Sequence, residues 1–296
     1  MVGRRGRPRV WAKVVVVVGL AAGFELALAP ASGAATPDPT YYVALGGSAS
    51  VGFQPTRDKP RGAETDSGYA NDLFARERAR WPTLELVHLG CPGTTTETML
   101  DGAGHCHDAE GSQMADALDF LHSHRSTVLM TVDLGFNDVS RCLHHEEVDA
   151  ACVDGALAAV HDQLTRIAAE LRAAGGSRMQ IIGLGHFDPY LGDERLGPRG
   201  AAFAAASLPV IARLNDTMRS AYAGAAIPMA DVASAFEMTD DEATAWGTGP
   251  DLARNVARVC MFTWMCAPAP QGPNAHPNDA GYQAISNAIA QVVDRH

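Results

Sequence analysis

The chain has 296 residues, 47% of them hydrophobic, which is enough to bury the core of one sizeable domain. Its formal net charge is −11 at pH 7, from 34 acidic and 23 basic side chains. Such an acidic chain has no electrostatic attraction for nucleic acid or for anionic membrane surfaces, so we expect neither as a partner.

The first 34 residues have the pattern of a secretory signal peptide. Basic residues precede an apolar run over residues 14–29, and the small residues Ser32 and Ala34 take the −3 and −1 positions of a cleavage site. The run contains Glu25 and is short for a bilayer span, so an uncleaved anchor is the alternative. We predict a secreted or envelope-associated protein, no integral membrane segment after cleavage, and one domain over residues 35–296.

The first predicted strand ends in a serine on a glycine turn. Residues 41–45 form an apolar run of the β type, and Gly46, Gly47 and Ser48 follow it. A serine at the tip of such a turn can face a pocket, where a base within hydrogen-bond reach would make it a nucleophile. A plain loop serine is the alternative for this position taken alone.

Two further apolar runs end in turns that suggest the same chemistry. Residues 84–89 lead to Gly90, and residues 127–134 lead to Gly135-Phe136-Asn137-Asp138. If the strands are parallel, the three turns lie at one edge of the sheet, where α/β folds bind ligands. The backbone N–H groups of Ser48 and Gly90 and the side-chain amide of Asn137 would there supply donors for an oxyanion.

Helical patterns separate the strands. Between residues 153 and 174 apolar side chains recur every three or four residues, and Gly175-Gly176 then ends the helix. Two more β-type runs follow, over residues 179–184 and 227–232, and Pro228 places the second at a strand start or a sheet edge. The alternation predicts an α/β fold with a mainly parallel five-stranded sheet between two layers of helices.

The six cysteines fall in three local pairs. An even number in an exported chain favours disulfides, and their proximity favours sequential pairing of Cys91 with Cys106, Cys142 with Cys152, and Cys260 with Cys266. Four histidines beside these cysteines make a metal site the alternative: His105, His107, His144 and His145. Zinc-type C-x-x-C spacing is absent, so we expect loop histidines and no metal ion.

Near the far end of the chain, His276 stands in Asn274-Ala275-His276-Pro277-Asn278, just before a helical segment. A fold that brought it within hydrogen-bond reach of Ser48 would create a serine-histidine hydrolase.

Other residues have two interpretations. The segment from His186 to Tyr190 follows the fourth strand and either contacts substrate or forms a turn at Asp188-Pro189. Aromatic and methionine side chains beside the last two cysteines either line an acyl pocket or pack on the core: Phe262, Trp264 and Met265. Three carboxylates without a spacing argument are interpreted as caps or surface charges: Asp66, Asp72 and Asp133.

Taken together, these segments resemble the SGNH, or GDSL, hydrolases. Four segments are similar to blocks I, II, III and V of that family, in order: Gly46 to Ser50, Gly90, Gly135 to Asp138, and His276 to Asn278. The six cysteines and Gly90-Cys91-Pro92-Gly93 are similar to secreted bacterial esterases and lipases with three disulfides. The resemblance implies a flavodoxin-like three-layer α/β/α fold, Ser48 as nucleophile, His276 as general base, an oxyanion hole of Ser48, Gly90 and Asn137, and no cofactor.

Two positions depart from the family pattern. Gly47 stands where the motif has the aspartate of Gly-Asp-Ser, so the carboxylate before the nucleophile is missing and the turn that aims Ser48 could be looser. Pro273 stands three residues before His276, where the triad acid usually lies. The Pro273 carbonyl oxygen or the Asn274 side chain could instead orient the imidazole by accepting from Nδ1–H.

We therefore expect a monomeric, secreted serine esterase or lipase. Its substrate would be a small-molecule, lipid or acylated-glycan ester, hydrolysed through an acyl-enzyme on Ser48 with His276 as base. An acyltransferase that uses the same site is one alternative. A degenerate member that binds esters or glycans without turnover is another, motivated by Gly47 and Pro273.

Overall fold

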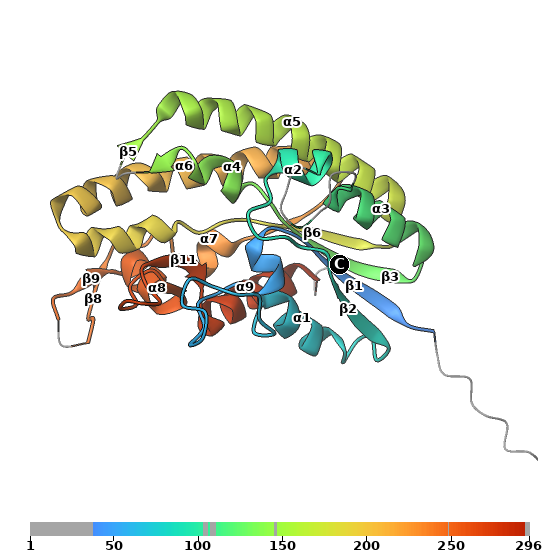
Figure 1. Cartoon of the computed structure of the whole chain (residues 1–296), viewed down its shortest axis with the longest axis horizontal. Helices are drawn as coiled ribbons and strands as arrows, with labels where there is room; N and C mark the ends of the chain where they lie inside the picture. Colours follow the sequence, from blue (N-terminus) through green and yellow to red (C-terminus); the bar gives the residue numbers. More distant parts are fainter. Residues whose placement is uncertain (1–37, 103–105, 107–110, 145–146, 248, 294–296) are drawn as a thin grey trace, which may run out of the picture. The chain divides into compact units, whose positions relative to one another are not determined.

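Five parallel strands form the central sheet of the computed structural model, in the order β2-β1-β3-β6-β7 (Figure 1). Their bounds are Thr40–Gly46 for β1, Leu84–His88 for β2, Thr127–Asp133 for β3, Gln180–Leu184 for β6 and Met229–Ala230 for β7. The predicted fold class is confirmed, and Pro228 does precede the edge strand β7.

The structure describes residues 38–102, 106, 111–144, 147–247 and 249–293. The predicted signal peptide over residues 1–34 lies outside this part of the chain. Among the described residues, no helix has the length and apolar character that crossing a membrane requires.

Helices cover both faces of the sheet because successive strand side chains point to opposite sides. Val43 and Leu45 face one core, and Tyr42 and Ala44 face the other. The first core is closed by α2 (Thr96–Asp101), α3 (Gln113–Ser123), α4 (Phe136–Ser140), α5 (Ala150–Gly175) and α6 (Pro198–Ala223). The second is closed by α1 (Tyr69–Glu77), α7 (Val232–Ala235), α8 (Arg254–Phe262) and α9 (Asp279–Val293) (Figure 1).

The long helix α5 matches the periodic segment predicted over residues 153–174. Its first turn is capped by Asp149, whose side chain accepts from the N–H of Cys152. It ends at Gly175, and the next residue, Gly176, has a positive φ of 71°, a conformation that glycine adopts without steric cost. The predicted apolar side chains of this helix are buried in the first core.

Short antiparallel ribbons and 3-10 segments, which the periodicity did not predict, complete the fold. The ribbons are β4 (Leu143–His144) with β5 (Glu147–Val148), β8 (Ala243–Thr244) with β9 (Leu252–Ala253), and β10 (Thr263–Trp264) with β11 (Asn274–Pro277). The 3-10 segments are η1 (Ser48–Val51) and η2 (Pro189–Leu196). Strands of two to four residues are too short for a period to be visible in the sequence.

The three disulfides join the cysteines sequentially, as their spacing predicted. Cys91 pairs with Cys106, Cys142 with Cys152, and Cys260 with Cys266. Each therefore closes a short local loop.

Candidate active site

Ser48 opens the 3-10 turn η1 directly after β1. The turn is tight because β1 and β3 lie in contact: Gly46 has a φ of 122°, and a Cβ there would stand 2.0 Å from the carbonyl oxygen of Asp133. The N–H of Gly47 donates to that same carbonyl oxygen at 2.7 Å. Only glycine fits at position 46, so the backbone can leave the sheet and expose Ser48.

His276 reaches Ser48 from β11, at the other end of the chain. Its Nε2 lies 2.9 Å from Ser48 Oγ, and its Nδ1 lies 2.8 Å from Asn274 Oδ1. The backbone N–H of His276 also donates to Asn274 Oδ1, at 3.0 Å. Because an amide oxygen only accepts, Nδ1 carries the ring proton in this arrangement and Nε2 accepts from the serine hydroxyl.

Asn274, rather than Pro273, contacts the imidazole within the described part of the chain. Asn274 and His276 are two residues apart on β11, so their side chains lie on one face of the strand. Pro273 precedes the strand. Burial lowers the pKa of His276 to about 4, so the ring is neutral at pH 7.

The other predicted donors lie around this pair. Asn137 is the second residue of α4, which follows Gly135. Its Nδ2 donates to the Thr94 carbonyl at 2.9 Å and lies 3.2 Å from where a Cβ on Gly47 would stand. Gly90 follows β2, and a Cβ there would stand 1.8 Å from Ser50 Oγ. Gly90 therefore allows its loop to contact the serine turn.

Two residues of this site were missed by sequence reasoning. Gln113, 1% exposed at the start of α3, receives the Gly46 N–H on Oε1 at 2.9 Å and donates from Nε2 to the Gly46 carbonyl at 3.0 Å. No sequence signal distinguishes it from a surface glutamine.

Asp133 is the second residue whose place in the site was missed. Of its two interpretations, a cap or a surface charge, the surface charge is wrong because the residue is buried. It is 8% exposed at the end of β3, and its carboxyl lies near the backbone N–H groups of Ala49 and Ser50. Burial raises the pKa of Asp133, while the nearby His186 and the two hydrogen bonds oppose that rise. Its place at the last position of a buried strand, just before Gly-x-Asn-Asp, was the available signal.

A cavity of about 120 Å³ opens beside Ser48. Its walls are mainly apolar and include Leu134, Phe136, Leu184, Phe187, Val232 and Ile285, and the polar groups at its mouth include Ser48, Asn137 and His276. The shape suits an apolar group attached to a carbonyl carbon at the serine.

The segment from His186 to Tyr190 combines both of its predicted roles. His186 and Phe187 line the cavity, whereas Asp188 is fully buried and caps η2 by accepting from the N–H of Tyr190 at 3.0 Å. Ser207 Oγ also donates to Asp188, at 2.7 Å. Among the described residues, Phe262 and Met265 pack on the second core instead of lining the cavity.

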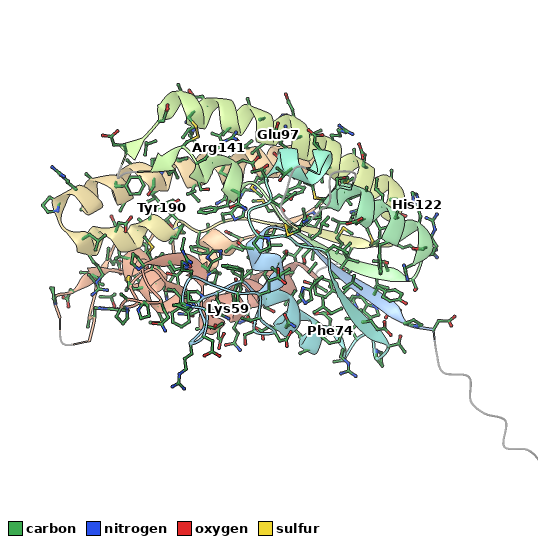
Figure 2. The ribbon with its side chains drawn as sticks, viewed as in Figure 1. Lys59, Phe74, Glu97, His122, Arg141 and Tyr190 are labelled. Carbon is green, nitrogen blue, oxygen red and sulfur yellow. A yellow bond between two sulfur atoms is a disulfide. The ribbon has the colours of Figure 1, made fainter. Side chains whose placement is uncertain are left out.

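An open groove of about 730 Å³ lies on the other side of Ser48 and His276. Its walls include Phe53, Lys59 and Glu64 from the loop between η1 and α1, and Pro92 and Gly93 from the loop after β2. Lys59 is labelled on the first of these loops in Figure 2. The serine therefore separates an apolar cavity from a more polar groove.

No group of three histidine, cysteine or acidic side chains that could hold a metal ion occurs among the described residues. His105, His107 and His145 lie outside them, and the side chain of His144 is not described.

Both the sequence and the fold are similar to those of known proteins. Residues 44–284 match the family model of the GDSL-like lipase/acylhydrolases. The crystal structure of phospholipase A1 from Streptomyces albidoflavus NA297 is similar in fold, with a TM-score of 0.55 and 20% identity over 86% of this chain and 99% of that one. No curated protein matches the chain.

Two other solved structures are more distant. A member of the lipolytic protein G-D-S-L family from Veillonella parvula DSM 2008 has a TM-score of 0.46 and 12% identity, over 87% of this chain and 100% of that one. The native aryl esterase of M. smegmatis has a TM-score of 0.46 and 13% identity, over 86% and 99% of the two chains.

Proposed function

The chain belongs to the GDSL-like lipase/acylhydrolase family and is a carboxylic ester hydrolase, and we propose that it hydrolyses short-chain esters with Ser48 as nucleophile and His276 as general base. The observation that carries this proposal is the 2.9 Å contact between Ser48 Oγ and His276 Nε2, in a ring whose other nitrogen is held by Asn274.

In the first half-reaction, Ser48 Oγ attacks the ester carbonyl carbon while its proton passes to His276 Nε2. The tetrahedral intermediate then collapses, the bond to the alcohol oxygen breaks, and the imidazolium returns the proton to the leaving alkoxide. In the second, a water molecule loses a proton to Nε2 and attacks the acyl carbon. The bond between that carbon and Ser48 Oγ then breaks, the acid leaves, and the imidazolium returns the proton to Ser48 Oγ. The depressed pKa of His276 supports this role, because the base is already unprotonated at neutral pH.

The oxyanion of each tetrahedral intermediate would be bound by the N–H groups of Ser48 and Gly90 and by the amide of Asn137. Removing one such donor typically costs about 100- to 1,000-fold in kcat. The contact between Asn137 Nδ2 and the Thr94 carbonyl supports the assignment, since it holds the amide in a defined orientation beside the serine turn.

The cavity and the groove suggest where the acyl and alcohol parts of the ester bind. The apolar cavity is suited to the acyl group, and the open groove to the alcohol, which must leave so that water can enter. An engineered apolar cavity of about 150 Å³ holds benzene, so a cavity of about 120 Å³ favours acyl chains of about six carbons or fewer. This favours short-chain esters over long-chain lipids.

We also propose that the protein is exported by the signal peptide at residues 1–34. Three disulfides support an oxidising compartment, where such bonds persist.

The proposed function is tested with p-nitrophenyl esters of increasing acyl length and the Ser48→Ala variant. We expect hydrolysis of the acetate to hexanoate esters, a steep decline for the palmitate, and loss of activity in the variant. A fluorophosphonate probe should label Ser48 in the native protein. Equal rates for both proteins, or no labelling, would contradict the assignment and favour an ester-binding protein without turnover.

A further inference from the structure

The 3-10 turn that carries Ser48 has no cap from its own first residue. Gly47 occupies the N-cap position of η1 and has no side chain to accept a hydrogen bond. In the Gly-Asp-Ser motif this position holds an aspartate, and N-cap carboxylates accept from the N–H groups of the second and third residues of a turn. Here these are the N–H groups of Ala49 and Ser50.

A carboxyl from another strand reaches those two donors. The carboxyl of Asp133, on β3, lies close enough to the backbone N–H groups of Ala49 and Ser50 for hydrogen bonding from them to oppose the rise in its pKa. The Ser50 N–H also donates to the Gly47 carbonyl, at 3.3 Å. Its Oδ2 lies 3.5 Å from the position that a Cβ on Gly47 would take. The Asp133 carboxyl thus occupies space beside the turn that a longer residue at position 47 would need.

The main chain holds Asp133 firmly in this place. Asp133 pairs with Gly46 in the register of β1 and β3, and its carbonyl oxygen accepts from Gly47 N–H at 2.7 Å. Its side chain is 8% exposed, so water does not compete well for the carboxyl. Both the backbone and the side chain of one residue therefore bind the start of η1.

We infer that Asp133 is the positioning residue for Ser48, and that it caps the nucleophile turn from β3 in place of the absent carboxylate at Gly47. This inference rests on the proposed role of Ser48 as nucleophile. It predicts that positions 47 and 133 are exchangeable sources of one carboxyl cap.

The experiment compares Asp133→Ala, Gly47→Asp and the double variant Gly47→Asp/Asp133→Ala. The single Asp133→Ala change should lower kcat roughly 10- to 100-fold with little change in KM, because a misdirected nucleophile affects the reaction more than substrate binding. Gly47→Asp alone should also lower kcat, since two carboxyl groups would meet in a buried space. The double variant should recover kcat to within about threefold of the native value.

Gln113→Ala is the matched control, because the Gln113 side chain also binds the end of β1 but bonds only to Gly46 and Thr94 within the described part of the chain, not to η1. Adding Gly47→Asp to Gln113→Ala should restore nothing. Unchanged kcat in Asp133→Ala would overturn the inference. A loss that the double variant fails to reverse would also overturn it, because the carboxyl would then act elsewhere, for instance through His186.

Thermal unfolding of the same variants separates this inference from the proposed function. The Gly47→Asp change should lower the Tm of the native protein and raise that of Asp133→Ala, whether or not esters are hydrolysed. If native protein and Ser48→Ala hydrolyse esters equally, the proposed function fails. If Gly47→Asp changes the Tm of the native protein and of Asp133→Ala in the same direction, the inference that Asp133 caps η1 is contradicted.

Discussion

At the scale of single residues, the proposed base, His276, is oriented by an amide through its Nδ1. His276 lies 228 residues from Ser48 in the chain, yet its Nε2 is 2.9 Å from the serine oxygen. The Asn274 amide holds Nδ1 without adding negative charge, and burial lowers the pKa of His276 to about 4. An amide partner orients the ring but stabilises imidazolium less than a carboxylate does.

This geometry predicts the pH dependence of the reaction. The acid limb of the kcat/KM profile should fall near pH 4 instead of near the ordinary histidine value of 6.5, because the base works only when neutral. Asn274→Asp should move that limb to higher pH, since a carboxylate at Nδ1 favours the charged ring. Hydrolysis followed at the isosbestic wavelength of p-nitrophenol measures both profiles.

Asn274→Ala is the control for this prediction. It removes the orienting oxygen without adding charge, so kcat should fall while the limb does not move upward. An unshifted profile in Asn274→Asp would show that residue 274 does not face Nδ1 in the working enzyme.

At the scale of elements, the segment between β6 and α6 both lines the site and stabilises the fold. Phe187 faces the cavity, and the next residue, Asp188, is buried between η2 and α6, where it binds Tyr190 and Ser207. Desolvation raises the pKa of Asp188 from 3.8 to about 7. A neutral carboxyl is therefore the favoured form at this junction below pH 7.

Asp188→Asn should accordingly stabilise the protein at alkaline pH. The folded pKa exceeds the unfolded one, so the stability linked to this group is complete below pH 3.8 and is lost as the pH rises through 7. An amide stays neutral, keeps an acceptor for Tyr190 N–H and lets Ser207 Oγ donate to the Ala204 carbonyl, now 3.1 Å away. We expect a Tm a few degrees above native at about pH 9 and no gain below about pH 4.

The bounds of the strands show how accurately the local sequence pattern predicts the elements. The predicted bounds of the first four strands agree with the structure to within one residue at each end. The fifth strand is shorter than its apolar run, because Pro228 has no N–H for the ladder and Asp231 already caps α7. The ribbon that carries His276 was not predicted, since β10 and β11 pair only through tertiary structure.

At the scale of the whole molecule, the two cores hold the sheet and the disulfides only tie local loops. The paired cysteines are 15, 10 and 6 residues apart, so none of the bonds joins distant parts of the chain. Loops of this length contribute less to stability than long ones would.

We therefore expect the fold to persist without the Cys142–Cys152 bond, at a lower stability. The Cys142→Ala/Cys152→Ala variant should lose about 2–3 kcal/mol of unfolding free energy in urea and keep the native far-UV circular dichroism. Reducing the native protein should lower stability by at least as much, because it opens all three loops. Loss of the far-UV spectrum in the variant would mean that this bond holds the fold.

The sequence by itself determined the fold class, the order of the strand-turn segments, the cysteine pairs and the candidates Ser48, Gly90, Asn137 and His276. These follow from local periodicity, turn chemistry and spacing, which neighbouring residues decide. Only the tertiary structure decided that Asn274 meets the imidazole, that Asp133 lies beneath the serine turn and that an apolar cavity opens beside it. Those features depend on the pairing of β1 with β3 and on the approach of the β10–β11 ribbon to the distant serine turn. Such contacts are not visible as a periodic pattern in the sequence.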